Sequence, residues 1–162
     1  MTRVLLDNEQ WDFGTNCFVC EPKNPRGLGI PFYLDAEAGH VEADVTPQPF
    51  HSSAPMFAHG GFSSALIDEG MAWVIIAIAH RFGVTRELTL TFQRPVWVGQ
   101  PHRVVCRIES HDGADLTAVG EVRDAKGRVC VSARGTFQAL TKEQVTGAIG
   151  GVSSAAQSYA NS

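Results

Sequence analysis

Residues 62 to 79 constrain this chain more than any other segment, because they are apolar almost without interruption. A helix at a protein surface keeps one polar face, whereas a helix that is apolar all round has to be buried. The segment therefore predicts a helix that the rest of the chain surrounds. Asp68 and Glu69 carry the only charges within it and argue against a membrane span. We expect these two carboxylates to be paired, hydrogen-bonded or shifted in pKa.

Runs of strand-like residues lie on both sides of this helix. Turn residues such as His111-Asp112-Gly113 and Lys126-Gly127 separate the later runs, which are typical of an antiparallel meander. The predicted strands cover residues 30–35, 41–46, 84–92, 104–110, 116–124 and 129–140. We therefore predict an α+β fold in which an antiparallel β-sheet wraps around one long buried helix.

The chain has 162 residues and 44% hydrophobic content, which suits one domain with a sizeable core. We expect an N-terminal arm over residues 1–29 that packs on the core and includes a possible short helix near Asp7 to Trp11. The domain itself is expected over residues 30–140. Residues 141–162 are rich in Gly, Ser and Ala and are expected to form a flexible tail.

The charge distribution limits the classes of partner. The net charge is −4 and the basic residues are scattered, so we expect a small-molecule ligand and no nucleic acid or membrane. Without an N-terminal apolar run, and with four cysteines that we interpret as free thiols, a cytoplasmic location is expected. Cys17 and Cys20 have the spacing of half a zinc site. Because no second pair follows and a structural zinc site needs four ligands, we expect no metal and interpret them as a turn that packs the arm.

The start of the apolar helix has the layout of an acyl-transfer site. His59-Gly60-Gly61 sets backbone donors at a glycine turn, and Asp68 follows within the helix. Eight residues of helix separate Gly60 from Asp68 by roughly 12 Å, so one reaction centre cannot touch both. A two-fold axis that places Asp68 of one chain by Gly60 of another removes this difficulty, and predicts an obligate dimer.

Several short motifs support a family resemblance over about residues 16 to 140. They are Cys-Phe-Val-Cys at 17–20, Asn-Pro-Arg-Gly-Leu-Gly at 24–29, His-Gly-Gly at 59–61, Leu-Ile-Asp-Glu at 66–69, Thr85, Phe-Gln-Arg-Pro at 92–95 and Asp-Ala-Lys-Gly at 124–127. In this order and spacing they resemble the hotdog-fold acyl-CoA thioesterases, and within them the phenylacetyl-CoA-type (PaaI-like) branch.

The resemblance implies hydrolysis of an acyl- or aryl-CoA thioester without a cofactor. By this likeness the Gly60 N–H polarises the thioester carbonyl, Asp68 acts as nucleophile or as general base for water, and Thr85 helps to orient substrate or water. Members of the family are similar to one another in forming dimers or dimers of dimers with sites at the interface. Supporting roles fall to His59, Gly61, Ser53 and Glu69, and a substrate pocket to Phe62, Met56 and Phe57.

The sequence leaves several alternatives open. Relatives often have Asn or Gly at the position of Ser53, and Gly at the position of Met56. Turnover and acyl specificity could therefore differ from those of the family. His59 is better suited to satisfying the helix start than to proton transfer. Two other functions compete with hydrolysis. They are a non-catalytic acyl-CoA-binding module and a hotdog hydratase or dehydratase acting on enoyl-CoA or acyl-carrier protein, which needs a converging Asp/His pair.

Overall fold

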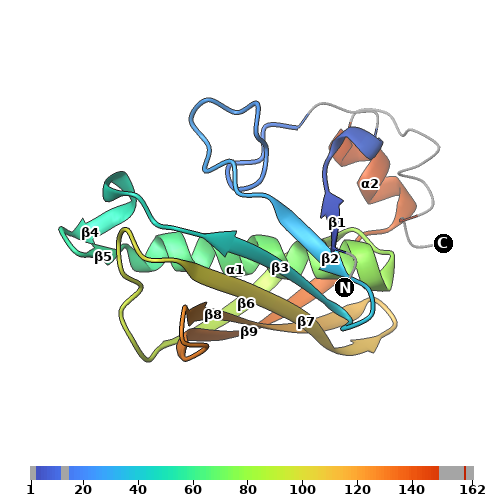
Figure 1. Cartoon of the computed structure of the whole chain (residues 1–162). Coiled ribbons are helices and arrows are strands. Elements are labelled where there is room, and N and C mark those ends of the chain that lie inside the picture. The colour runs from blue at the N-terminus through green and yellow to red at the C-terminus, as the bar shows by residue number, and fades with distance from the viewer. Residues whose placement is uncertain (1–2, 12–14, 150–158, 160–162) are drawn as a thin grey trace.

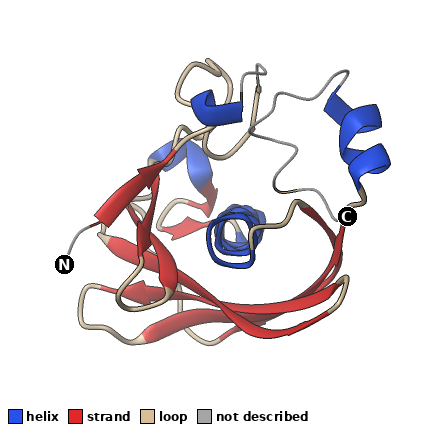
Figure 2. Ribbon diagram, turned by 90° about the vertical axis from the view of Figure 1, so that its right-hand side faces the viewer, coloured by secondary structure: helices blue, strands red, loops and turns tan. Residues whose placement is uncertain are grey.

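A computed structural model describes residues 3–11, 15–149 and 159. One antiparallel sheet curls around a central helix, as the end-on view in Figure 2 shows. The sheet consists of β1 (Arg3–Leu6), β2 (Phe32–Asp35), β3 (His40–Val45), β6 (Gly83–Phe92), β7 (His102–Asp112), β8 (Asp115–Asp124) and β9 (Val129–Ala139). The predicted α+β fold with a sheet around one helix is confirmed, and it is the arrangement of a hotdog fold.

The strand order is β1-β2-β3-β7-β8-β9-β6, and each neighbouring pair is antiparallel (Figure 1). β6 follows the helix in sequence but joins the sheet beside β9, at the edge opposite β1. In β3, Val41, Ala43 and Val45 belong to the core, whereas on the opposite face Asp44 is exposed and Glu42 is covered by its ion pairs with Arg3 and His40. This alternation is what fixes the register of a half-buried strand.

The central helix, α1 (Gly60–Val74), begins two residues before the predicted start and continues as a π-helical turn, η3 (Ile75–Ala79). It packs closely on the sheet, because a Cβ built on Gly120 of β8 would lie 2.8 Å from both Ile67 Cγ2 and Cys106 Sγ. By length and composition Gly60–Ala79 would suffice to cross a membrane. Core helices pass the same test, and the surrounding sheet accounts for the apolar character of this one.

Three short elements were not predicted. β1 adds a strand from the arm to the sheet, and β4 (Ser52–Ala54) with β5 (Phe57–Ala58) forms a small hairpin in the expected proline-rich loop, after the 3-10 turn η2 (Pro49–His51). Such short strands depend on contacts with distant parts of the chain rather than on local pattern. The short helix expected near Asp7 to Trp11 is present as a 3-10 turn, η1 (Glu9–Trp11).

The expected flexible tail begins instead with a helix, α2 (Lys142–Ile149), in which Val145 is buried. Thr141 and Gln144 form a reciprocal capping box: the Gln144 N–H donates to Thr141 Oγ1 (3.3 Å), and the Thr141 N–H donates to Gln144 Oε1 (2.9 Å). Most of the remaining tail lies outside the described residues, so the expectation of flexibility there stays a prediction.

Candidate active site

His59 caps the start of α1. Its Nδ1 accepts a hydrogen bond of 2.8 Å from the Gly61 N–H, while its carbonyl accepts one of 2.9 Å from the Phe62 N–H. A Cβ on Gly61 would come within 2.9 Å of the same Nδ1, so only glycine leaves room for the ring in this position. His59 and Gly61 thus act together as an N-terminal cap. This is the geometry expected for a supporting role of His59 at the helix start.

The Gly60 N–H comes directly before these two capped N–H groups in the first turn of α1. First-turn amides of a helix have no partner within the helix, and among the described residues no acceptor bonds to this one. Gly60 borders a hollow of about 360 Å³. The other residues that line this hollow are Phe57, Ala58, Ser63, Phe92, Gln93, Arg94, Pro95 and Val96. An unpaired amide at a helix N-terminus that borders a hollow is a ready donor for an anionic oxygen.

Asp68 lies two turns further along α1 and meets β6. The Thr85 hydroxyl donates a hydrogen bond of 2.8 Å to Asp68 Oδ1. Thr85 is exposed, and the strand bulges between Thr85 and Glu87, where its register with β9 shifts. Bulges at sheet edges often reorient side chains at functional sites. The structure thus brings together the predicted Asp68 and Thr85.

Gly60 and Asp68 do not meet within one chain. Both belong to α1, where eight residues correspond to roughly 12 Å along the axis. β6 runs back along the helix, so its end at Phe92 lies by Gly60, with the ring 3.3 Å from the Cβ position of that glycine. Its beginning at Thr85 lies by Asp68. The chain therefore presents the donor and the carboxylate at opposite ends of one exposed edge strand.

Comparison with known proteins identifies a similar family. A profile described as "Thioesterase superfamily" matches residues 57–131, which include the helix start, Asp68 and Thr85. A crystal structure of a thioesterase superfamily protein is 28% identical, with a TM-score of 0.71, over 85% of this chain and 68% of that one. The resemblance to hotdog thioesterases is confirmed. No curated protein matches the chain.

Two further solved structures are similar to this chain. A putative thioesterase of Ralstonia eutropha JMP134, described as related to phenylacetic acid degradation, is 26% identical with a TM-score of 0.61 over 68% of this chain and 85% of that one. A hypothetical thioesterase of Streptococcus pneumoniae TIGR4, solved with coenzyme A, is 18% identical with a TM-score of 0.59 over 62% of this chain and 78% of that one. The second likeness concerns the hotdog fold alone.

Glu69 points away from the edge that carries Asp68. Its carboxylate faces the N-terminal arm, where Glu69 Oε1 and Cys17 Sγ lie 3.3 Å apart in a hydrogen bond. Burial raises the pKa of Glu69 to about 7, and the neighbouring Cys17 and Asp68 add to the increase. Hydrogen bonds from the Cys20 thiol and from backbone amides lower the pKa of Cys17 to about 5. Glu69 thus belongs to a cluster separate from the Asp68–Thr85 pair.

The remaining predicted residues divide between surface and core. Ser53 is exposed on β4. Met56, just before β5, and Phe57, within β5, are exposed as well, and Phe57 lines the hollow next to Gly60. Phe62 is buried and stacks on His51, with ring centroids 4.3 Å apart, so it forms part of the core. Sequence reasoning missed Phe92 as a neighbour of Gly60, although an aromatic residue directly before Gln-Arg-Pro was a usable signal.

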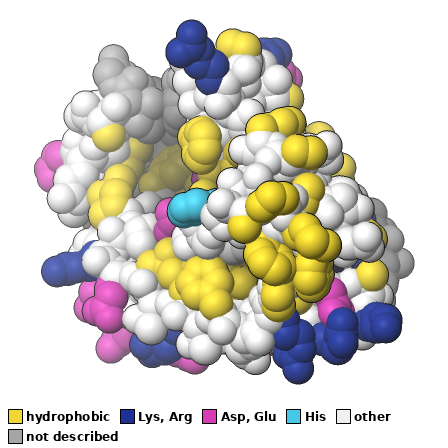
Figure 3. All heavy atoms as spheres, turned by 90° about the vertical axis from the view of Figure 1, so that its left-hand side faces the viewer, with side chains coloured by type: hydrophobic (Ala, Val, Ile, Leu, Met, Phe, Trp, Pro, Cys, Tyr) yellow, Lys and Arg dark blue, Asp and Glu magenta, His cyan; other side chains and the backbone are white. Residues whose placement is uncertain are grey.

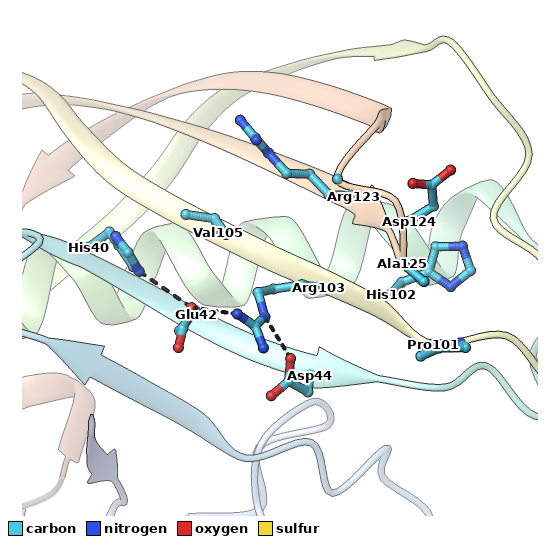
Figure 4. Close-up of a pocket in the computed structure, with 11 residues that line it drawn as sticks. His40, Glu42, Asp44, Pro101, His102, Arg103, Val105, Arg123, Asp124 and Ala125 are labelled. Atoms are coloured by element: carbon cyan, nitrogen blue, oxygen red, sulfur yellow. Dashed lines mark hydrogen bonds and ion pairs between the residues drawn. The ribbon is translucent and has the colours of Figure 1, made fainter. Parts of the chain in front are cut away.

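A larger hollow, of about 650 Å³, lies on the outer face of β3, β7 and β8 (Figure 4). Its charged groups are mostly paired with one another, because Arg103 contacts Glu42 at 3.7 Å and Asp44 at 2.7 Å, and His40 contacts Glu42 at 3.4 Å. Neither Gly60 nor Asp68 borders it. Size alone does not make a site, and the predicted site residues Gly60 and Asp68 lie elsewhere.

Proposed function

We propose that this chain hydrolyses an acyl- or aryl-CoA thioester to the free acid and coenzyme A. The observation that carries the proposal is the placement of an unpaired Gly60 N–H and a Thr85-bound Asp68 at the two ends of β6. The thioesterase profile over the same residues supports it. The hotdog neighbour solved with coenzyme A supports the choice of substrate class.

In this proposal Gly60 stabilises the oxyanion that forms when the thioester carbonyl is attacked. Its N–H adds a direct hydrogen bond to the positive end of the α1 dipole. Glycine also keeps the hollow beside this amide open, because a Cβ at position 60 would lie 3.3 Å from the Phe92 ring that lines the same hollow. One donor of this kind typically contributes on the order of 3 kcal/mol to the transition state.

Asp68 supplies the reacting oxygen or removes a proton. Thr85 holds Oδ1, which leaves Oδ2 to face the thioester. As nucleophile, Asp68 would form a mixed anhydride and release the coenzyme A thiolate, and water would then hydrolyse the anhydride. As general base, Asp68 would take a proton from water while the water oxygen attacks the carbonyl. Thr85 is in either case a positioning residue.

We further propose that the complete site forms between two chains. β6 is the last strand of the sheet, and its free side has no strand partner among the described residues. Antiparallel pairing of two β6 strands about a two-fold axis would set the Thr85 end of one against the Phe92 end of the other. That arrangement brings Asp68 of one protomer toward Gly60 of its partner. A dimer of dimers remains an expectation from the family.

The acyl group would bind at the end of the molecule that carries β4, β5 and the start of α1. Exposed hydrophobic side chains gather on this end in Figure 3. They are Phe50, Met56, Phe57, Phe92 and Trp97, with the Phe57 and Trp97 rings 4.9 Å apart. Exposed apolar groups of this extent are typical of a ligand-binding or subunit surface. We assign Met56 and Phe57 to the acyl side of the pocket, and Phe62 to support beneath it.

Thiol release from a panel of short, branched and aryl acyl-CoAs tests the function. Asp68→Asn should lower turnover by about 10²- to 10⁴-fold, because it removes the acid and keeps the shape. Asp112→Asn, at the exposed end of β7, is the matched control and should behave as wild type.

Other outcomes would replace the proposal. A rise in melting temperature with acyl-CoA but no thiol release would identify a binding module. A change in enoyl absorbance without thiol release would identify a hydratase. Unchanged thiol release in Asp68→Asn would remove Asp68 from the mechanism.

A further inference from the structure

Cys17, Cys20 and Glu69 converge where the N-terminal arm packs against α1. One atom from each, the two Sγ atoms and a carboxylate oxygen, lies within 4.8 Å of both others. All three side chains are partly buried, so the cluster is sheltered without being closed to solvent. Cys17 and Cys20 belong to one turn, whereas Glu69 belongs to α1 and follows Cys20 by 49 residues in the sequence. The cluster therefore exists only in the folded chain.

The turn that carries the cysteines is held in place from several directions. The N–H groups of Val19 and Cys20 both approach Cys17 Sγ, at 3.4 and 3.3 Å. The Leu28 N–H donates to the Phe18 carbonyl at 2.7 Å, which ties the turn to the segment that follows. Gly27 allows this contact, because a Cβ there would lie 2.8 Å from the same carbonyl. Backbone N–H groups directed at sulfur stabilise thiolate over thiol.

No cationic side chain among the residues that the structure describes pairs with this cluster. Among the ion pairs formed by the described residues, none involves Glu69, and the other members of the cluster are thiols. A carboxylate buried without a positive partner is unfavourable, and two thiolates beside it would make it more so. A bound divalent cation would neutralise all three groups at once.

We propose that Cys17, Cys20 and Glu69 bind a divalent thiophilic metal ion of the Zn²⁺ class. Thiolate sulfur and carboxylate oxygen are both ligands of zinc, and thiolates favour it over magnesium or calcium. Three protein ligands leave a fourth position for water or another small ligand. The sequence argued against zinc because it offers no second cysteine pair. The fold supplies the missing third ligand from α1.

The carboxylate distinguishes this proposal from a simple redox pair. A Cys17–Cys20 disulfide would use both thiols and leave the partly buried Glu69 carboxylate with no cationic partner among the described residues. A metal ion uses all three groups and joins the arm to α1 at the residue next to Asp68. The site is thus a cross-link between two parts of the chain, and no step of the proposed hydrolysis passes through it.

Metal analysis and cobalt substitution of the full chain test the proposal. Protein purified under reducing conditions should contain about one zinc per chain. After metal removal, added Co²⁺ should give a thiolate-to-cobalt charge-transfer band with the visible bands of a tetrahedral site. Cys17→Ser, Cys20→Ser and Glu69→Gln should each weaken Co²⁺ binding by more than about 100-fold, the upper range seen when only an outer partner of a metal ligand is lost.

Cys130→Ser in β9 is the control, because it removes a thiol outside the cluster and should leave the cobalt spectrum unchanged. Glu69→Gln keeps the test informative if a cysteine variant fails to fold, since it retains both thiols. Two results would overturn the proposal. One is reduced wild-type protein that gives no charge-transfer band with Co²⁺. The other is a Glu69→Gln variant that binds Co²⁺ as tightly as wild type.

Discussion

The two sides of α1 place neighbouring carboxylates in opposite surroundings. On the β6 side, Asp68 accepts a hydrogen bond from Thr85 at an exposed strand edge. On the arm side, Glu69 meets the Cys17 thiol in a partly buried cluster. Successive helical residues point about 100° apart, so two adjacent acids reach two different neighbours. Surroundings rather than residue type therefore separate their roles.

The comparison also shows what each side lacks. The β6 side has a fixed carboxylate, but the proposed oxyanion donor of the same chain, Gly60, lies two turns earlier in the same helix. The arm side has three metal-binding atoms, and no cationic side chain in the described part of the chain pairs with them. We infer that a second protomer completes the first side and that a metal ion completes the second. Each deficit identifies the kind of partner that would remove it.

The largest effect is expected at Gly60, and it tests whether the amide of this residue is the oxyanion donor. Gly60→Pro removes the N–H donor and adds a ring at the first helical position, where proline fits, and His59 already has the extended backbone (ψ 140°) that precedes proline. Gly60→Ala adds a Cβ and keeps the donor. Thiol release should fall about 10²- to 10³-fold further in Gly60→Pro than in Gly60→Ala. Equal rates would show that this amide is not the donor.

The same variant tests whether the site is shared between chains. Co-expression of Gly60→Pro with Asp68→Asn yields heterodimers in which one of the two sites keeps both intact residues. Random pairing should then restore roughly a quarter of wild-type thiol release. A mixture as inactive as its parents would place the complete site within one chain.

A smaller effect is expected at Thr85, and it tests whether the hydroxyl of this residue positions Asp68. Thr85→Val keeps the shape but removes the donor to Asp68 Oδ1. Loss of one hydrogen bond to a charged group corresponds to about 1.5 kcal/mol, or roughly a tenfold fall in kcat. Thr85→Ser should recover most of it with little change in KM. A Ser variant as slow as the Val variant would contradict the positioning role.

The smallest effect concerns pH and a buried group remote from both sides of α1. Burial lowers the pKa of His102 from its ordinary value of 6.5. Its Nδ1–H faces the Gln100 carbonyl (2.9 Å), and its Nε2 accepts from the Trp97 N–H, which requires the neutral ring. Because the folded pKa is the lower one, this stability is present above pH 6.5 and is lost as pH falls below it.

Urea unfolding at several pH values checks the His102 prediction. His102→Gln should reduce the loss of unfolding free energy below pH 6.5. Part of that loss should persist in the His102→Gln variant, because burial also lowers the pKa of His51. His111→Gln, on the exposed end of β7, serves as the control. A pH dependence identical to wild type in His102→Gln would contradict the prediction.

Long periodic segments made most of the fold predictable. The apolar run from residue 62 required burial, and alternation in the later strands fixed their faces, so β6, β7, β8 and β9 were expected close to their actual bounds. β1 and the hairpin of β4 and β5 were missed, because strands of two to four residues carry little pattern of their own. α2 was missed although Thr141 and Gln144 have the spacing of a capping box.

The site was predictable only in part. The family resemblance named Gly60, Asp68 and Thr85, and the structure adds that Asp68 and Thr85 are in contact. Phe92 escaped notice because its approach to Gly60 depends on how β6 crosses α1. The cluster with Glu69 escaped for a similar reason. Ligand spacing counts residues along the chain, whereas Glu69 reaches Cys17 and Cys20 across the fold.

The free side of β6 has a consequence for how activity depends on concentration. A long edge strand with unpaired backbone groups tends to associate with other chains, whether productively or in aggregates. In the proposed dimer, the contact that covers this edge also brings Gly60 and Asp68 together. Dilution below the dissociation constant would therefore expose the edge and dismantle the site in one event, so an isolated protomer would be both inactive and prone to aggregate.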